Sequence, residues 1–112
     1  MGRGDHLGEL EQLVLLAVLS LPRDEAYGMN VRQVLEERAG RNLSVPTVYS
    51  ALDRLEVKGL VTSRLGEATR ERGGRAKKLF TVEPAGVAGL REARRMFDRM
   101  WEAAAPVEQS GG

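Results

Sequence analysis

The strongest chemical signal in this chain of 112 residues is a run of basic side chains around a pair of glycines. Residues 70–78 read Arg-Glu-Arg-Gly-Gly-Arg-Ala-Lys-Lys, so five of nine positions are basic. Arginine and lysine bind phosphate oxygens, and arginine also enters the narrow minor groove of DNA. Glycine lets the backbone approach a surface closely. We therefore expect this segment to contact DNA, through Arg70, Arg72, Gly73, Gly74, Arg75 and Lys77. A solvated loop that only aids solubility is the alternative.

The charge of the chain is unevenly distributed along the sequence. Residues 41–82 contain nine basic and four acidic residues, a net charge of +5, whereas the remainder carries −4. A basic middle segment is typical of a surface that binds a polyanion. An arginine-rich hairpin exposed only to solvent would have the same charge.

A helix predicted from Ser44 to Lys58 precedes the basic loop. Ser44 can cap this helix, and Pro46 is tolerated in its first turn because no helical N–H is needed there. An apolar side chain recurs at helical spacing and defines an inward face, formed by Val48, Ala51, Leu52 and Leu55. The candidate DNA contacts on the rest of the helix are Ser44, Pro46, Thr47, Tyr49, Ser50 and Arg54. Arg54 could instead pair with Asp53 or Glu56. An ordinary amphipathic core helix would fit these residues equally well, so the basic loop decides the interpretation.

The other patterns predict a mainly α-helical chain with one small β-hairpin. Helices are expected at about residues 7–21 and 26–39 before the one at Ser44, and short strands at 60–65 and 77–82 flank the loop. This order predicts a winged helix-turn-helix over residues 7–83, followed by a C-terminal dimerisation helix over 84–105. Residues 1–6 and 106–112 are expected to be disordered tails.

Apolar residues recur at spacings of three and four along the last predicted helix. They are Leu90, Ala93, Phe97, Met100, Trp101 and Ala104. This pattern is typical of a helix that packs against another helix, and we expect a homodimer. Packing on the first helix of the same chain, or on the partner's first helix, remains possible. Met96, Phe97, Met100 and Trp101 could also hold a flat, apolar effector. The simpler account is that these four residues only fill the core of the dimer.

The chain lacks the residues that several other classes of protein require. The chain has no cysteine, and its one histidine, His6, lies in a predicted tail. We therefore expect no enzyme, metal site or cofactor. The longest apolar run, Leu13–Leu19, is too short to cross a bilayer, and no secretory signal is visible, so a soluble, cytoplasmic protein is expected. A winged helix used only for docking proteins is the alternative function, and it predicts an apolar or acidic outer side on the third helix.

Three motifs in this order resemble the PadR family of bacterial transcriptional regulators, in its short form with one C-terminal helix. They are Ala26-Tyr27-Gly28, the stretch 45–56 with Gly59-Leu60-Val61, and Gly73-Gly74-Arg75 followed by Lys78. The resemblance spans roughly Leu7 to Leu90. It implies a dimer of two winged helices that represses a nearby promoter, and short-form members can bind planar, apolar compounds. It also implies that the main DNA contacts are Thr47, Tyr49, Arg75 and Lys77.

Two positions depart from the pattern of that family. The family usually has a Tyr-Tyr pair near Leu79-Phe80 and a threonine three residues before the glycine that matches Gly86. Here Leu79 replaces one aromatic residue, and Glu83 stands at the helix cap. A phosphate contact from the first tyrosine hydroxyl is therefore lost, but the fold is unaffected.

Overall fold

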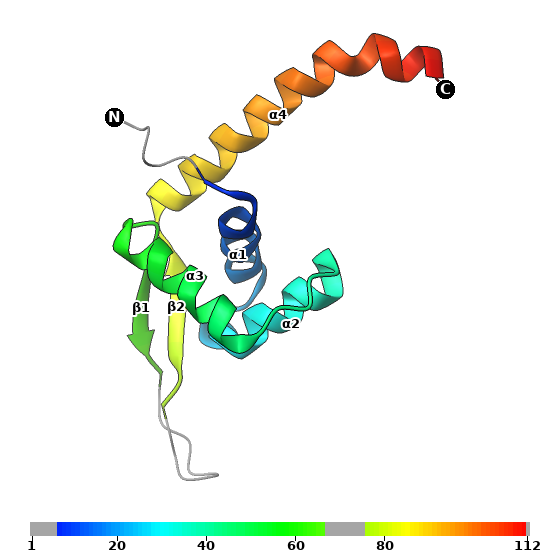
Figure 1. Ribbon diagram of the computed structural model, residues 1–112. Coiled ribbons are helices and arrows are strands. Elements are labelled where there is room, and N and C mark those ends of the chain that lie inside the picture. Colours follow the sequence, from blue (N-terminus) through cyan, green and yellow to red (C-terminus); the bar gives the residue numbers. More distant parts are fainter. Residues whose placement is uncertain (1–6, 67–75, 112) are drawn as a thin grey trace.

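The computed structural model describes residues 7–66 and 76–111, with side chains up to residue 104 (Figure 1). The predicted order of three helices, a hairpin and a last helix is confirmed. The elements are α1 (Glu9–Ser20), a 3-10 turn η2 (Arg23–Glu25), α2 (Gly28–Ala39), α3 (Val45–Val57), β1 (Val61–Leu65), β2 (Lys78–Val82) and α4 (Pro84–Gly111). The fold is therefore mainly helical, with a two-stranded antiparallel wing.

The predicted ends of α2 and α3 have the expected local causes. The Ser44 hydroxyl accepts a hydrogen bond from the Thr47 backbone N–H at 3.2 Å, which satisfies one of the free donors at the start of α3. Gly40 ends α2 at φ +66°, and Gly59 follows α3 at φ +78°. Both glycines adopt the left-handed conformation that other residues avoid.

Helix α2 begins at Gly28, two residues later than predicted. The Ala26 carbonyl accepts a hydrogen bond from the Phe80 N–H at 2.8 Å, and Tyr27 forms a β-bridge with Leu79. Ala26 and Tyr27 thus extend along the edge of β2 instead of starting the helix. Leu79, which replaces the family's aromatic residue, is buried at this junction.

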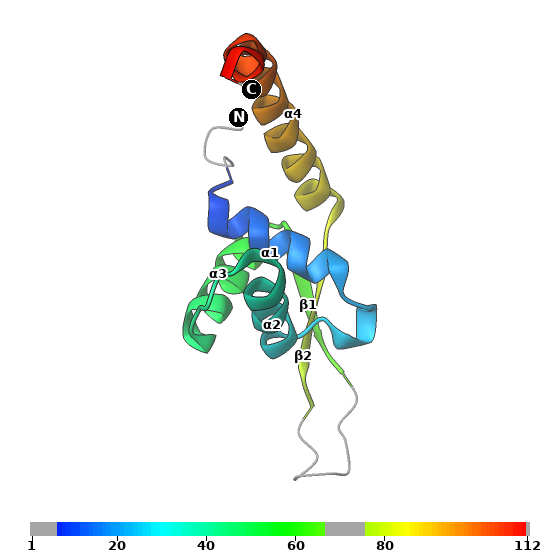
Figure 2. The same cartoon turned by 90° about the vertical axis from the view of Figure 1, so that its right-hand side faces the viewer.

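The core lies between α1, α2, α3 and the inner face of the hairpin, as the two perpendicular views show (Figures 1 and 2). The largest fully buried side chains come from all of these elements and include Leu15, Leu35, Leu52, Leu55 and Phe80. The hairpin pairs Val61 with Val82 and Leu65 with Lys78. This packing fixes the wing beside α3.

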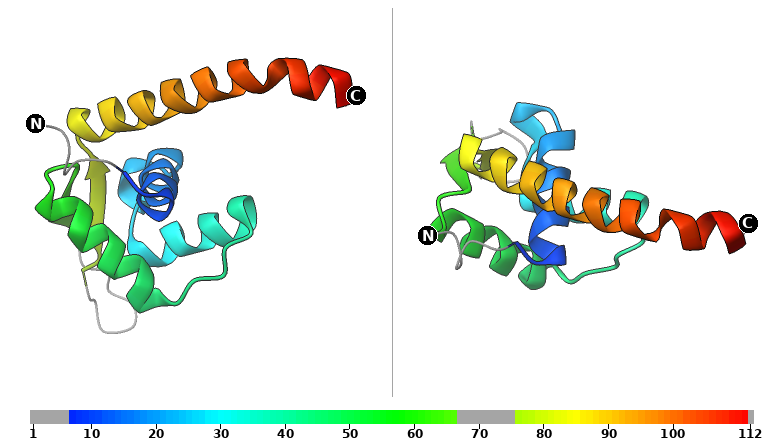
Figure 3. Two further views of the ribbon diagram at one scale, coloured as in Figure 1. Left: turned by 45° about the horizontal axis from the view of Figure 1, so that its top comes forward. Right: turned by 90° about the horizontal axis from the view of Figure 1, so that it is seen from above.

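Helix α4 is attached to the domain only by its first turns and then projects away from it (Figure 3). Gly86 permits the attachment, because a Cβ there would lie 2.7 Å from the Leu60 carbonyl oxygen. Leu90 packs partly against the core of its own chain, although it was expected in the face towards another helix.

The end of α4 also differs from the prediction. The helix continues to Gly111 instead of ending near Ala105, so most of the tail predicted over 106–112 is helical. The segment 102–105 is Glu followed by three alanines, which favour helix, and no glycine occurs between Gly89 and Gly111 to end it. The predicted tail over 1–6 lies outside the described residues.

Candidate nucleic-acid interface

Three sides of α3 are occupied by the rest of the domain. Its inward face is fully buried. Towards the wing, the Glu56 carboxylate accepts a hydrogen bond from the Ser63 hydroxyl at 2.7 Å and lies 3.9 Å from the Lys78 ammonium. Towards α1, the Lys58 ammonium donates to the Glu11 carboxylate at 2.7 Å. The fourth side faces outwards, and its four exposed residues at helical spacing are Pro46, Ser50, Asp53 and Val57.

Two of the predicted contact residues at the start of α3 cap the helix. The Ser44 and Thr47 hydroxyls lie 2.8 Å apart, and both side chains are exposed. The hydrogen bonds between them fix the direction of the first turn. The same turn presents free backbone N–H groups, a position that favours a phosphate. Ser44 and Thr47 are thus positioned for the predicted contact with DNA, and they also cap α3.

Tyr49 has a packing role that the sequence did not reveal. Its ring lies so close to Gly28 that a Cβ there would come within 2.3–2.5 Å of three atoms of the tyrosine, including the hydroxyl oxygen. Tyr49 is only half-buried, and its hydroxyl lies at the start of α2. The glycine of the Ala26-Tyr27-Gly28 motif therefore seats the aromatic ring that holds α3 against α2.

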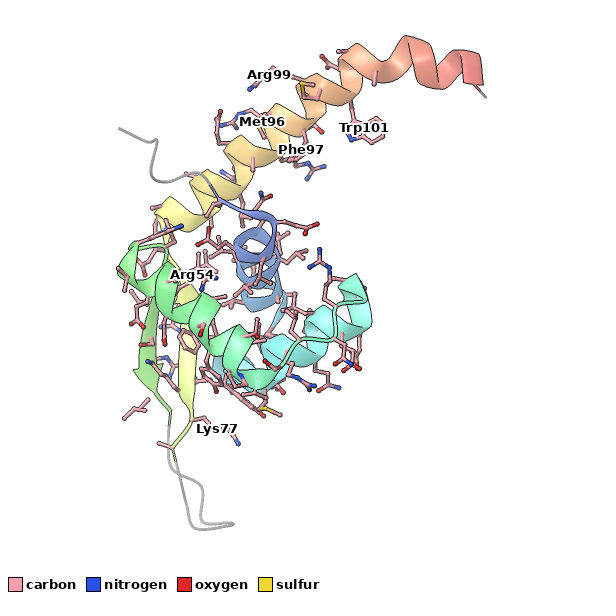
Figure 4. All side chains as sticks on the ribbon, viewed as in Figure 1. Arg54, Lys77, Met96, Phe97, Arg99 and Trp101 are labelled. Carbon is pink, nitrogen blue, oxygen red and sulfur yellow. The ribbon has the colours of Figure 1, made fainter. Side chains whose placement is uncertain are left out.

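Arg54 lies on the flank of α3 that faces α1 (Figure 4). It is exposed, and its positive charge acts on Glu11, which is buried in the same region. Burial alone would raise the pKa of the Glu11 carboxyl. The hydrogen bonds from Lys58 and from the Gly8 backbone N–H, with the charges of Lys58 and Arg54, together lower that pKa below its ordinary value of 4.5.

Part of the basic charge of residues 41–82 is neutralised inside the chain. Ion pairs join Arg41 to Glu9 and Lys58 to Glu11, two acidic residues that lie outside this segment. Lys78 pairs with Glu56, whose charge is already included in the total. The total of +5 therefore overstates the charge available to a polyanion. The loop residues Arg70, Arg72, Gly73, Gly74 and Arg75 lie outside the described residues, so their DNA contacts stay predictions.

Lys77 and Arg64 stand together at the base of the wing. The Lys77 ammonium lies 4.7 Å from the centroid of the Tyr27 ring, and its side chain is exposed at the lower end of β2 (Figure 4). Arg64 is exposed on β1, where its guanidinium donates to the Arg23 carbonyl at 3.4 Å. Arg64 contributes to the positive charge of residues 41–82, but it is not among the DNA contacts predicted from the sequence. The pairing of β1 with β2 brings Arg64 to the same surface hollow as Lys77 and Tyr27.

The projecting part of α4 carries apolar side chains that the chain leaves exposed. Phe97, Met100 and Trp101 are 53%, 64% and 60% exposed. Phe97 and Trp101 lie on one side of the helix, whereas Met96 and Arg99 lie on the other (Figure 4). Ala93 and Met96 are half-buried. On α1, Leu16 and Leu19 are also about half exposed. In the described part of the chain, no helix combines the length and apolarity required to cross a membrane.

Three helices followed by a hairpin that packs beside the third form a winged helix-turn-helix, a fold that occurs in DNA-binding transcription regulators. The model of the transcriptional regulator PadR-like family matches residues 15–92, and the chain belongs to this family. Its members are regulators of transcription and not enzymes. Transcriptional regulator Rv3488 of Mycobacterium tuberculosis is 36% identical over 77 residues, which cover 69% of this chain and 67% of that protein.

Solved structures of the family have the same fold. A PadR family transcription regulator from Clostridium difficile R20291 superimposes with a TM-score of 0.70 at 20% identity, covering 89% of this chain and 98% of that one. A PadR-like transcription factor from Bacteroides fragilis also gives 0.70 at 22% identity, covering 88% of each chain.

Proposed function

We propose that this chain represses transcription in the cytoplasm by binding an inverted-repeat operator in duplex DNA as a homodimer. The observation that carries the proposal is the outer side of α3, which the domain leaves open beside the base of the wing. The major groove of B-DNA is wide enough for an α-helix. Thr47 and Ser50 would meet the groove from the first turns of α3, while Lys77 and the basic loop would hold the flanking phosphates.

Binding is tested with labelled duplex DNA by fluorescence anisotropy at increasing salt. A dimer that neutralises six to ten phosphates should lose about 10³–10⁵ in affinity between 50 and 200 mM salt, because bound counterions are released. The double variant Arg72→Ala/Arg75→Ala should bind more weakly and with a shallower salt slope. Full affinity of that variant, or binding independent of salt, would contradict the proposal.

A docking module for another protein is the second candidate, and two residues of α3 favour it. Asp53 is acidic, and Val57 is 88% exposed, so the C-terminal half of the outer side has the predicted acidic and apolar character. Pro46, Thr47 and Ser50 in the N-terminal half do not. Changing Thr47 or Ser50 to alanine should alter the preferred DNA sequence if DNA binds. A docking module would show no sequence preference at all.

The dimer is proposed to form through α4. A single chain exposes Phe97, Met100 and Trp101 along one side of this helix, and a second copy would cover them. Leu16 and Leu19 offer a neighbouring apolar surface on α1, which supports packing of α4 against α1 of the partner as well as against its α4. A two-fold dimer requires half-sites in inverted orientation, about one helical turn of DNA apart.

An effector is proposed to bind beside Phe97 and Trp101 between the two protomers. Aromatic rings stack on flat molecules, and Met100 can adapt to their outline. Met96 projects from the other side of α4, so in this arrangement it would not line the same site. Trp101 is the only tryptophan, so its fluorescence reports directly on this place. Flat aromatic dyes should quench it and weaken operator binding. Unchanged fluorescence and affinity across a varied panel would leave these four residues with packing alone.

A further inference from the structure

Asp53 occupies the middle of the outer side of α3. It is exposed and follows Pro46 and Ser50 at helical spacing, with Val57 one turn later. The buried residues of α3, Val48, Ala51, Leu52 and Leu55, occupy the opposite side of the helix, so this row points away from the core. Helix α3 itself lies at the outside of the domain (Figure 1). Any duplex that receives α3 in its major groove therefore meets a carboxylate there.

Neither the helix nor the domain accounts for this aspartate. Aspartate is a weak helix former, and position 53 is far from the first turn, where a carboxylate would stabilise the helix. Within residues 7–66 and 76–104, its carboxylate has no hydrogen bond or ion pair. Glu56 on the same helix differs, because it binds Ser63 and Lys78 of the wing. Contacts among the described residues thus account for Glu56 but not for Asp53.

A carboxylate in the major groove discriminates between bases. It can only accept hydrogen bonds at neutral pH. Guanine presents two acceptors, thymine presents one acceptor and a methyl group, and adenine places an acceptor next to its amino group. Cytosine presents an amino donor alone. A carboxylate is therefore satisfied by cytosine, and opposite the acceptor edges or near phosphates it weakens binding.

We propose that Asp53 is a specificity-determining residue that selects a cytosine in each half of the operator. The inference rests on the proposed DNA binding and adds the chemistry of one base pair to it. Asp53 lowers the affinity for DNA in general, through its charge, and restores affinity at sites with cytosine in the matching position. The acidic character of the outer side of α3 then serves DNA recognition and not a protein partner.

The two variants Asp53→Asn and Asp53→Ala test this role separately. Asparagine binds adenine through a donor and an acceptor, so Asp53→Asn should shift the preference at one position of each half-site from cytosine to adenine. Asp53→Ala should lose the preference at that position, with a change of about 5- to 10-fold in relative affinity. Both variants should bind unrelated duplexes more tightly, since one negative charge is removed.

The experiment is selection from a random-sequence duplex library with the full-length protein, followed by anisotropy on the enriched sequences. Asp98→Asn on α4 is the matched control, because it removes the same charge from an exposed position on another helix. It should keep the unaltered preference. The proposal is overturned if Asp53→Asn and Asp53→Ala enrich the same sequences as the unaltered protein, with all affinities raised by one factor. If the unaltered protein enriches no sequence, the proposed function itself fails, a result distinct from an unchanged preference.

Discussion

The winged-helix domain and the projecting part of α4 differ in how far their apolar side chains are buried. In the domain, Leu52, Leu55 and Phe80 are fully buried by neighbours from the same chain. On α4, Phe97 and Trp101 are more than half exposed, although they recur at helical spacing just as regularly. The same periodic pattern thus completes a core in one region and leaves an uncovered stripe in the other. Burial of that stripe requires a surface that residues 7–66 and 76–104 of one chain do not supply.

The largest effect is expected from making the stripe of α4 polar. The double variant Phe97→Asp/Trp101→Asp should convert the proposed dimer into a folded monomer, because two carboxylates cannot be buried without partners. Size-exclusion chromatography with light scattering measures the mass, and circular dichroism checks the fold. Operator affinity should fall by at least an order of magnitude, since one half-site binds without the other. A control variant, Arg91→Ala on the polar side, should remain dimeric. An unaltered protein that is monomeric at micromolar concentration would remove the basis of the comparison.

Inside the domain, the contact of Tyr49 with Gly28 can be broken without touching α4. Gly28→Ala would force a methyl group into the Tyr49 ring and should lower the free energy of unfolding by about 1–3 kcal/mol. Gly89→Ala is the control, since its Cβ would meet only the flexible end of Leu7, at 3.1 Å, and alanine favours helix. Urea unfolding should show Gly89→Ala at least as stable as the unaltered chain. Equal losses in both variants would contradict the packing role of Tyr49.

The cap of α3 should contribute a smaller amount. Ser44→Ala removes the hydrogen bond to the Thr47 N–H and should cost about 1 kcal/mol in the same unfolding assay. Ser50→Ala, on the outer side of the same helix, should change stability by less than about 0.5 kcal/mol. If Ser50→Ala destabilises the fold more than Ser44→Ala, the outer side of α3 must make contacts with the rest of the domain.

The smallest effect concerns Glu11, which ties α1 to the end of α3 through Lys58. Its pKa is lowered in the folded state, so its ionised form stabilises the fold above the pKa of the unfolded chain. That contribution should disappear as the pH falls from about 5 through the lowered folded-state pKa. Thermal unfolding followed over this range should show a shallower loss for Glu11→Gln than for the unaltered chain. Parallel curves for the two proteins would show that Glu11 is not linked to folding.

The order of the helices and strands and most of their boundaries follow from local signals in the sequence. Ser44 and Pro46 mark the start of α3, and Gly40 and Gly59 mark the ends of two helices, because these residues act through the backbone of their own turn. The apolar spacing of Val48, Leu52 and Leu55 likewise fixed which side of α3 is buried. Such local signals need no knowledge of distant neighbours, and they carried the family resemblance that the comparisons confirmed.

Packing between separate elements sets which polar and aromatic side chains remain free to bind a partner. The sequence predicts a basic surface over residues 41–82. The fold pairs three of its basic residues, Arg41, Lys58 and Lys78, with carboxylates 22 to 47 residues away in the chain. The seat of Tyr49 on Gly28 and the strand-like position of Ala26 depend equally on contacts between separate elements. Side-chain pairing of this kind is set by how helices and strands pack, and sequence spacing does not encode it. The exposure of Asp53 has the same origin, because it depends on the wing, α1 and the core covering the other three sides of α3.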